Sequence, residues 1–258
     1  MTANAALLLA AGRSERMAGH DKTTIPLAGQ PLAAHALRVF AGSPEIHAIV
    51  IVGNPHNHDA LVALADEYGR RKVIAVVIGG DRRQDSVRNG LAALTANGLQ
   101  PPDLIAIHDA ARPLVTNDMI EHGLRIAFEH GAAVASAPVH DTIKVIEATE
   151  TADPASGTAV QRTIDRATLR AAQTPQTFVW NLLKHAHAAH PETDTGTNTI
   201  TDTITDAITD DAMLVEALGQ PVILYDSGTP NPKVTTPTDL TIVEALLQAR
   251  SASTTANH

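Results

Sequence analysis

Short runs of consecutive hydrophobic residues recur along the first half of the chain, and segments with a helical pattern separate them. The runs are AALLLAA (5–11), HAIVIVG (47–53), KVIAVVIGG (72–80), DLIAIHDA (103–110) and AAVASAPV (132–139). The segments between them carry apolar residues at steps of three and four, as amphipathic helices do. Uninterrupted apolar strands that alternate with helices predict an α/β fold, in which a mostly parallel sheet is covered by helices on both faces.

The alternation changes after Pro138. Residues 139–166 alternate weakly and contain an acidic tip, EATETADPASG, which predicts a two-stranded arm that leaves the sheet. Residues 167–190 and 209–219 predict helices, PVILYDSG (221–228) predicts a last strand, and TPTDLTIVEALLQAR (236–250) predicts a last helix capped by Thr235 or Thr238. We expect a single domain over residues 1–250 and a flexible tail over 251–258.

A Thr/Asp-rich run, TDTGTNTITDTITDAITDD, occupies residues 193–211. Its carboxylates could be metal ligands, but a solvated segment of biased composition is the simpler interpretation, and we expect a surface insertion over about 193–208. Two histidine tracts, HNH (56–58) and HAHAAH (185–190), also resemble metal-binding sequences. Histidines two positions apart do not share a helix face, so we expect surface histidines there.

Composition narrows the classes of protein that fit this pattern. The chain has 258 residues, a net charge of −9 and no cysteine. Without cysteine there are no disulfides, thiolate zinc sites or cysteine nucleophiles, which is compatible with a cytoplasmic protein. The acidic balance argues against nucleic-acid partners. No basic residue precedes the first apolar run, which is too short to span a bilayer, so we expect neither a signal peptide nor a membrane partner.

Sheets of this kind bind ligands in the loops beyond the carboxyl ends of their strands, and the first such loop follows LLLAA. It reads AAGRSERM (10–17) and fits neither the G-x-G-x-x-G dinucleotide motif nor the G-x-x-x-x-G-K-[ST] phosphate loop. Its small residues, together with the cations Arg13, Arg16 and Lys22, could cradle a polyphosphate. A solvent loop with ordinary surface arginines explains the same residues equally well.

The loop GGDRRQDSVRNG (79–90) follows the third predicted strand. Gly79 and Gly80 permit the close approach of a flat ligand, and Asp81 and Ser86 offer hydrogen bonds. The arginines at positions 82, 83 and 88 add positive charge. A plain strand–helix turn capped by Asp85 or Ser86 accounts for the same sequence, and both interpretations can hold.

HDAARP (108–113) ends the fourth predicted strand and contains Asp109 and Arg112. The carboxylate could hold a ligand hydroxyl or a metal-bound water, and the guanidinium could hold a phosphate. A structural Asp–Arg pair is the alternative. Three of the first four strand ends thus carry polar groups and at least one arginine each, which favours a binding site for an anionic ligand over three independent surface loops.

Seven motifs occur in the order and approximate spacing of the 2-C-methyl-D-erythritol 4-phosphate cytidylyltransferase family, which the chain resembles from about Ala5 to Leu247. They are LLLAAGRSERM, GGDRRQDSV, HDAARP, PVHDTIK, TIDR, TPQTF and NPKVTTPTDL. HDAARP together with TPQ and KVTTPTDL is specific, whereas AAGRSERM alone marks nucleotidyltransferases in general. The resemblance implies a Rossmann-like sheet with a protruding β-arm, at about 139–166, through which two subunits form a homodimer.

The resemblance also implies a reaction. CTP is joined to a polyol phosphate, 2-C-methyl-D-erythritol 4-phosphate, with release of pyrophosphate and a requirement for Mg²⁺. The attacking phosphate monoester is already ionised at neutral pH, so no catalytic base is needed. The reaction needs cations that neutralise the reacting phosphates, and Arg16 and Lys22 resemble the two that do so in the family.

Other site residues carry over by resemblance in two groups. The group that resembles the cytidine and triphosphate site consists of Ala10, Ala11, Gly12, Ser14, Gly80, Asp81, Arg83 and Ser86. The group that resembles the acceptor site consists of Asp109, Arg112, Thr142, Arg166, Thr174 and Lys233, with Arg166 serving the partner subunit. No metal ligand is assigned, because the Mg²⁺ ion would be held mainly by the phosphates of CTP. The chain departs from the family at Lys22, which lies in HDKTTIPL where relatives read P-K-Q, and at His140, where arginine is common.

Three alternatives stay open. Ribitol 5-phosphate cytidylyltransferases share the fold and the chemistry but use another acceptor. A sugar 1-phosphate nucleotidyltransferase is disfavoured by the pairing of HDAARP with TPQ. A non-catalytic nucleotide-binding regulator would be expected to lose cations at Arg16, Lys22, Arg112 or Lys233, and all four are present.

Overall fold

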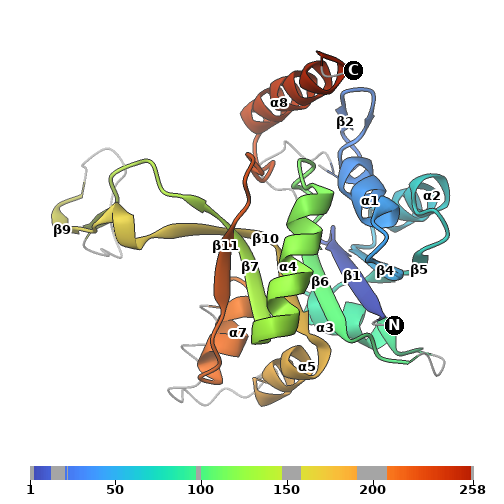
Figure 1. Cartoon of the computed structure of the whole chain (residues 1–258). Helices are drawn as coiled ribbons and strands as arrows, with labels where there is room; N and C mark the ends of the chain where they lie inside the picture. Colours follow the sequence, from blue (N-terminus) through green and yellow to red (C-terminus); the bar gives the residue numbers. More distant parts are fainter. Residues whose placement is uncertain are drawn as a thin grey trace.

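The computed structural model describes residues 3–12, 21, 23–96, 100–146, 158–190 and 208–256. A seven-stranded sheet with the order β11-β7-β10-β6-β1-β4-β5 forms its centre (Figure 1). Neighbouring strands are parallel except where β10 pairs with β6 and β7. The strands are β1 (Asn4–Leu9), β4 (Ala48–Gly53), β5 (Val73–Ile78), β6 (Leu104–Asp109), β7 (Ala132–Pro138), β10 (Arg170–Val179) and β11 (Ile223–Asp226). The predicted mostly parallel sheet is confirmed.

Helices cover both faces of the sheet, as the alternation of strands and helices predicts. Side chains along β1 point alternately to the two faces, so that Ala6 and Leu8 belong to one buried cluster while Ala5 and Leu7 belong to the other. The first cluster includes residues of α1 (Leu32–Gly42), α2 (His58–Tyr68) and α4 (Asn117–His130). The second includes residues of α3 (Arg83–Leu94), α5 (Trp180–Ala189) and α7 (Asp211–Ala217).

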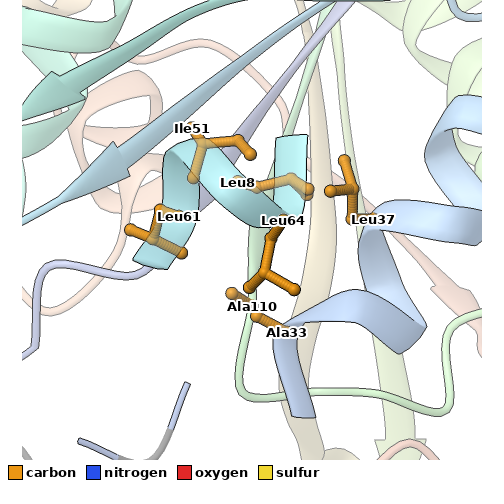
Figure 2. Close-up of a pocket in the computed structure, with 7 residues that line it drawn as sticks. All are labelled: Leu8, Ala33, Leu37, Ile51, Leu61, Leu64 and Ala110. Carbon is orange, nitrogen blue, oxygen red and sulfur yellow. The ribbon is translucent and has the colours of Figure 1, made fainter. Parts of the chain in front are cut away.

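A small apolar cavity lies in the first of these clusters, between the sheet and helices α1 and α2. Figure 2 shows its lining, which consists of Leu8, Ala33, Leu37, Ile51, Leu61, Leu64 and Ala110. Alanine at two of these positions leaves space that larger side chains would fill. Because every lining residue is apolar, this cavity offers no ligand for a phosphate or a metal.

The predicted arm is present and leaves the sheet after β7. Its strands β8 (Lys144–Ile146) and β9 (Val160–Thr163) pair antiparallel, and a short 3-10 helix, η3 (Arg166–Thr168), leads back to β10. In Figure 1 the arm projects to one side of the sheet. Among the described residues of the arm, the large apolar side chains of Ile143, Ile146 and Val160 are exposed.

The helix predicted over 167–190 is wrong in its first half, where β10 runs from Arg170 to Val179 before α5 begins. The alanines of RAAQTPQTFV suggest a helix, but Pro175 has no N–H to donate and would disrupt a helix interior. The strand fills the position between β6 and β7 and completes the sheet. Pairing across a sheet is a long-range contact that local helix propensity does not report.

The last helix, α8 (Pro237–Ala256), begins with a cap that differs from the predicted one. Thr236, rather than Thr235 or Thr238, precedes the helix, and its Oγ1 accepts the Asp239 N–H at 3.3 Å. The Asp239 carboxylate accepts the Thr236 N–H at 2.8 Å, and Pro237 occupies the first helical position. The helix also continues to Ala256, within the segment predicted as a tail, because SASTTA contains no glycine or proline to end it.

Helix α8 holds two loops at the carboxyl edge of the sheet. Arg250 donates to the carbonyl of Leu114 at 2.6 Å, and to the hydroxyl of Thr229 and the carbonyl of Pro230 at 2.9 Å each. Val243 belongs to a third buried cluster that includes Leu114 and Leu32. The turn after β6 and the loop after β11 are thereby fixed against each other. A short hairpin of β2 (Pro26–Leu27) and β3 (Gln30–Pro31) precedes α1.

Candidate functional site

A serine hydroxyl closes the loop between β5 and α3. The N–H of Gly80 donates to Oγ of Ser86 at 3.2 Å, and this hydroxyl lies 3.2 Å from the carbonyl of Arg82. A methyl group on Gly79 would lie 2.4 Å from the same oxygen, and one on Gly80 would lie 2.3 Å from Cβ of Asp85. Both glycines are therefore required for the loop to fold this tightly. Asp85 also accepts the Arg82 N–H at 3.3 Å, so the predicted capping role holds as well.

The loop after β1 lies against this glycine turn. A methyl group on Gly79 would come within 2.9 Å of Cβ of Ala11. Asn57 donates its side-chain amide to the Ala10 carbonyl at 3.0 Å and so fixes the backbone there. Two of the three predicted ligand loops thus meet, and Gly12 and Asp81 are exposed beside them. The predicted residues Ser14, Arg16 and Lys22 lie outside the described residues.

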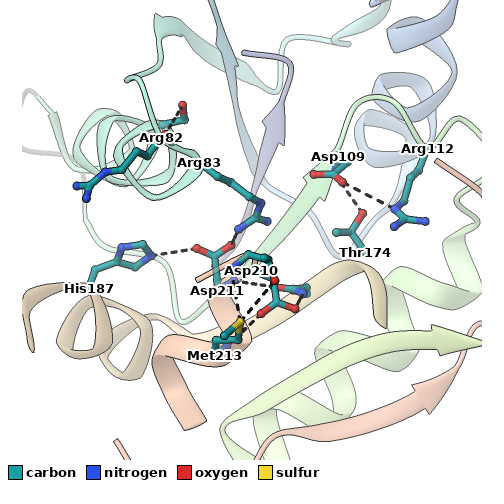
Figure 3. A network of polar contacts seen from close by, with 12 residues as sticks. Arg82, Arg83, Asp109, Arg112, Thr174, His187, Asp210, Asp211 and Met213 are labelled. Carbon is teal, nitrogen blue, oxygen red and sulfur yellow. Dashed lines mark hydrogen bonds and ion pairs between the residues drawn. The ribbon is translucent and has the colours of Figure 1, made fainter. Parts of the chain in front are cut away.

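Arg83, in the first turn of α3, is paired with a carboxylate of α7. Its guanidinium donates to Oδ2 of Asp211, which is fully buried, and Nε2 of His187 lies 3.1 Å from Oδ1 of the same carboxylate (Figure 3). The Asp211 N–H donates to Gln176 at 3.2 Å, and Gln176 donates to Asp210 at 2.8 Å. Burial would lower the pKa of Arg83, but the charges of Asp211 and Asp109 raise it. The guanidinium is therefore held charged and in a defined position.

Asp109, at the end of β6, is the centre of a second cluster. Nζ of Lys233 lies 2.8 Å from Oδ2 of Asp109, and Nε of Arg112 lies 3.8 Å from it. The Asp109 N–H donates to Oγ1 of Thr174 at 3.1 Å (Figure 3 shows Asp109, Arg112 and Thr174). The motifs HDAARP, TPQ and KVTTPTDL, far apart in the sequence, thus converge on one carboxylate.

The charges of the two clusters act on each other. Burial would raise the pKa of the Asp109 carboxyl, but Lys233 and then Arg83 outweigh it, and the pKa falls to about 2. Nε of Arg112 is buried and has no hydrogen-bond partner among the described residues. Three cations, Arg83, Arg112 and Lys233, lie near three carboxylates, Asp109, Asp210 and Asp211. The Nε–H of Arg112, which has no acceptor among the described residues, suits an anionic ligand such as a phosphate.

Two predicted site residues lie on the arm, apart from the Asp109 cluster. Thr142 and Arg166 are exposed, and the guanidinium of Arg166 donates to the carbonyl of His140. Figure 1 shows the arm directed away from the strand β6 that carries Asp109. The contacts described within one chain do not join these two residues to the cluster.

In the part of the chain that the structure describes, no three His, Asp or Glu side chains come together as a metal site. Over the same residues, no helix is long and apolar enough to cross a membrane.

Comparison with known proteins identifies the family of the chain. A family model described as 2-C-methyl-D-erythritol 4-phosphate cytidylyltransferase matches residues 4–249. The chain belongs to this cytidylyltransferase family. It is therefore a nucleotidyltransferase, a class of enzyme that generally takes a divalent cation.

Individual relatives match over nearly the whole length of the cytidylyltransferase. A 2-C-methyl-D-erythritol 4-phosphate cytidylyltransferase of Dehalococcoides mccartyi is 40% identical over 243 residues, covering 94% of this chain and 95% of the relative. One of Geobacillus thermodenitrificans is 39% identical over 249 residues, covering 96% and 98%. The crystal structure of the Thermus thermophilus enzyme of the same name superposes with a TM-score of 0.68 at 29% identity, covering 96% of this chain and all of that one.

Several residues of this cytidylyltransferase that hold the clusters together were missed in the sequence. His187 was expected on the surface with the HAHAAH tract, but it is buried against Asp211. Asp210 and Asp211 were grouped with the solvated Thr/Asp run, but Asp210 caps α7 by accepting the Met213 N–H at 3.1 Å. An Asp directly before the apolar periodicity of AMLVEAL was a usable signal for this cap. The pairing of Asp211 with Arg83 is long-range and left no local signal.

Proposed function

We propose that the protein transfers the cytidylyl group of CTP to 2-C-methyl-D-erythritol 4-phosphate in isoprenoid precursor biosynthesis. An oxygen of the acceptor phosphate attacks the α-phosphorus of CTP and forms a new P–O bond. The bond from this phosphorus to the oxygen that bridges to the β-phosphate breaks, and pyrophosphate leaves. The products are 4-diphosphocytidyl-2-C-methyl-D-erythritol and pyrophosphate. The names of the relatives and the family match support this acceptor.

The observation that carries the proposal is the convergence of Lys233, Arg112 and Thr174 on Asp109. Lys233 neutralises the carboxylate at 2.8 Å, while the buried Nε–H of Arg112 has no hydrogen-bond acceptor among the described residues. A phosphate with two negative charges would form charge-assisted hydrogen bonds with Arg112 and Lys233. A polyol hydroxyl could donate to Asp109. Thr142 and Arg166 complete the proposed acceptor site.

The nucleotide is proposed to bind over the loop after β1 and the loop after β5. Arg83 would then lie between the nucleotide and the acceptor at the Asp109 cluster. The tight packing of Gly79 against Ala11 brings both loops together and leaves the backbone at Gly80 exposed. The base and triphosphate site would consist of Ala10, Ala11, Gly12, Ser14, Gly80, Asp81, Arg83 and Ser86. Arg16 and Lys22 are proposed as the catalytic cations on the basis of their motif.

The divalent cation is proposed to be Mg²⁺. The donor set of the described residues fits an ion that arrives with the nucleotide, because Asp109, a buried carboxylate at this edge, is already paired with Lys233. Magnesium commonly binds through the phosphates of its substrate, so no dedicated group of protein carboxylates is required. When bound, the ion would neutralise part of the charge of the triphosphate.

The arm is proposed to form a homodimer and to bring Arg166 to the acceptor site of the partner subunit. The exposed apolar side chains Ile143, Ile146 and Val160 would be covered in such a dimer. A cytoplasmic location is part of the same proposal, since the reaction uses CTP and the chain lacks cysteine. The proposed domain is the whole of residues 1–250.

A pyrophosphate-release assay tests the proposal against its alternatives. CTP, UTP, ATP and GTP are each offered with 2-C-methyl-D-erythritol 4-phosphate, ribitol 5-phosphate or glucose 1-phosphate, with and without Mg²⁺. We expect turnover with CTP and the methylerythritol phosphate, dependent on the divalent ion. Faster turnover with ribitol 5-phosphate would assign the protein to the alternative enzyme, and no turnover with any pair would favour a regulator.

A further inference from the structure

His108 is a buried histidine that no substrate can reach. It is the penultimate residue of β6 and is fully inaccessible to solvent, directly before Asp109. Its ring packs against Phe40 of α1, with 5.1 Å between the ring centroids. A polar ring buried in this way must have its nitrogens satisfied by the protein.

The contacts of the two ring nitrogens define one tautomer. Nε2 lies 3.0 Å from the carbonyl oxygen of Arg112, which can only accept, so Nε2 carries the hydrogen. Burial lowers the pKa of His108 to about 4, so the ring is neutral at pH 7 and Nδ1 is an acceptor. Oγ1 of Thr174 lies 3.0 Å from Nδ1 and therefore donates to it. The lone pairs of Oγ1 remain to accept the Asp109 N–H at 3.1 Å.

This chain of hydrogen bonds continues to the other residues of the Asp109 cluster. Thr174 accepts the Asn231 side-chain amide on its carbonyl at 2.7 Å, and Arg112 donates to the carbonyl of Asn231 at 2.8 Å. Lys233 follows two positions later and pairs with Asp109. A change at His108 would therefore reach the orientation of the Thr174 hydroxyl on one side and the backbone at Arg112 on the other.

We propose that His108 is a positioning residue for the acceptor, acting through its neutral tautomer with hydrogen on Nε2. It sets Thr174 and Arg112 and touches no substrate itself. Because both nitrogens are engaged and the ring is buried, it cannot exchange a proton with the acceptor. This inference rests on the proposed function, since it assigns His108 to the acceptor side of that reaction.

Two substitutions remove, one at a time, the hydrogen bond of His108 with Thr174 and its hydrogen bond with the Arg112 carbonyl. In His108→Asn the side-chain oxygen reaches the place of Nδ1 and can still accept from Thr174, whereas the link to the Arg112 carbonyl is lost. In His108→Gln the amide nitrogen reaches the place of Nε2 and can still donate to that carbonyl, whereas the link to Thr174 is lost. His108→Phe keeps most of the packing and loses both.

We expect the substitutions to change the kinetic constants for the acceptor and to leave the KM for CTP nearly unchanged. In steady-state assays, kcat/KM for the acceptor should fall about tenfold for each single lost link and further for His108→Phe, as one hydrogen bond of about 1.4 kcal/mol implies. The KM for CTP should stay within about twofold. Adding Thr174→Val should cost less in the Gln variant, where only the hydrogen bond from the Asp109 N–H to Thr174 is left to lose, than in the Asn variant, where the hydrogen bond to His108 also persists.

His35→Gln is the matched control. Nε2 of His35 also bonds a backbone carbonyl, that of Leu27 at 2.8 Å, but outside the acceptor cluster, so its constants should stay near wild type. Wild-type enzyme must first turn over the acceptor, which distinguishes a failure here from a failure of the proposed function. The inference would be overturned if kcat/KM for the acceptor were unchanged in all His108 variants. It would also be overturned if the KM for CTP rose as much as the KM for the acceptor.

A measurement on the wild-type protein covers the case in which the variants do not fold. Histidine labelled with ¹⁵N, examined by long-range ¹H–¹⁵N correlation at pH 7, reports which ring nitrogen carries hydrogen. We expect His108 as the neutral form with hydrogen on Nε2, and the acceptor should shift its signals while CTP alone should not. A cationic ring, the other tautomer, or a response to CTP alone would contradict the proposal.

Discussion

Arg83 is held by a carboxylate 128 positions further along the chain, Asp211 of α7. The carboxylate is fully buried, while a quarter of the Arg83 side chain stays exposed. Burial would raise the pKa of Asp211, but Arg83 and then His187 lower it, so the pair is ionised at neutral pH. The position of the Arg83 side chain thus depends on Asp211, which belongs to none of the motifs.

Replacement of this carboxylate tests the pair. Asp211→Asn removes the charge of the carboxylate to which Arg83 donates, and breaking a buried ion pair from one side typically costs about 3 kcal/mol or more. For a chain of this length we expect the melting temperature to fall by about 6 °C or more. Asp226→Asn is the matched control, because the pair of Asp226 with Arg170 is exposed and should contribute little. Equal melting temperatures for the two variants would contradict this reading of Arg83.

The buried His108 predicts how stability depends on pH. Its pKa is about 4 in the folded protein and 6.5 ordinarily. As the pH falls from 6.5 to 4, the unfolded chain takes up a proton that the folded chain refuses, so the free energy of unfolding falls, by about 3 kcal/mol in full. The charged groups that act on His108 are Asp109, Arg112 and Lys233, and Asp109 keeps its charge over this range because its pKa is about 2.

Urea unfolding at pH 7 and pH 4.5 measures this effect. The loss of unfolding free energy between the two pH values should be smaller in His108→Gln than in wild type by about 2–3 kcal/mol. His35→Gln should behave like wild type. If wild type and His108→Gln lose the same amount, His108 is not the buried neutral group described.

At the scale of elements, the sequence predicts the strands and helices that a short-range pattern of apolar and polar residues determines. The parallel strands and the helices between them follow from uninterrupted apolar runs and three- and four-residue steps, and the observed bounds lie close to the predicted ones. Strand β10 was missed because its alanines favour a helix while its pairing with β6 and β7 is long-range. The same distinction holds at the site, where Asp109, Arg112, Thr174 and Lys233 were found through motifs while His187 and Asp211 were not.

The Thr/Asp run gives a prediction at this scale. Polar repeats bury little surface, and the entropy of loop closure depends weakly on length, so excision of Asp194–Thr205 should leave activity and melting temperature nearly unchanged. An excision extended through Asp211 removes the cap of α7 and the partner of Arg83, and should lower both. Similar behaviour of the two deletions would show that the boundary drawn before α7 is wrong.

At the scale of the whole molecule, the arm predicts that each site uses two chains. Arg166 lies on the arm, apart from the Asp109 cluster of its own chain, and is proposed to serve the partner. Homodimers of Arg16→Ala or Arg166→Ala should then each be nearly inactive. In a mixed dimer one site collects both lesions and the other none, and random re-association of equal amounts gives about half mixed dimers. About a quarter of wild-type activity should return.

The measurement is to dissociate, mix and re-form the two variants, and to assay them with CTP and the methylerythritol phosphate. Subunit exchange is verified separately with differently tagged chains. Activity that stays at the level of the separate variants, despite complete exchange, would show that each site is built from one chain.

A competition experiment tests the proposed reaction most directly. Equal concentrations of 2-C-methyl-D-erythritol 4-phosphate and ribitol 5-phosphate are incubated with the wild-type enzyme, Mg²⁺ and limiting CTP, and the products are identified by mass spectrometry. The ratio of products equals the ratio of kcat/KM for the two acceptors at equal concentration, so it reads the specificity of the Asp109 cluster in one reaction. The account predicts that 4-diphosphocytidyl-2-C-methyl-D-erythritol predominates with a matching amount of pyrophosphate, whereas a predominance of CDP-ribitol would contradict it.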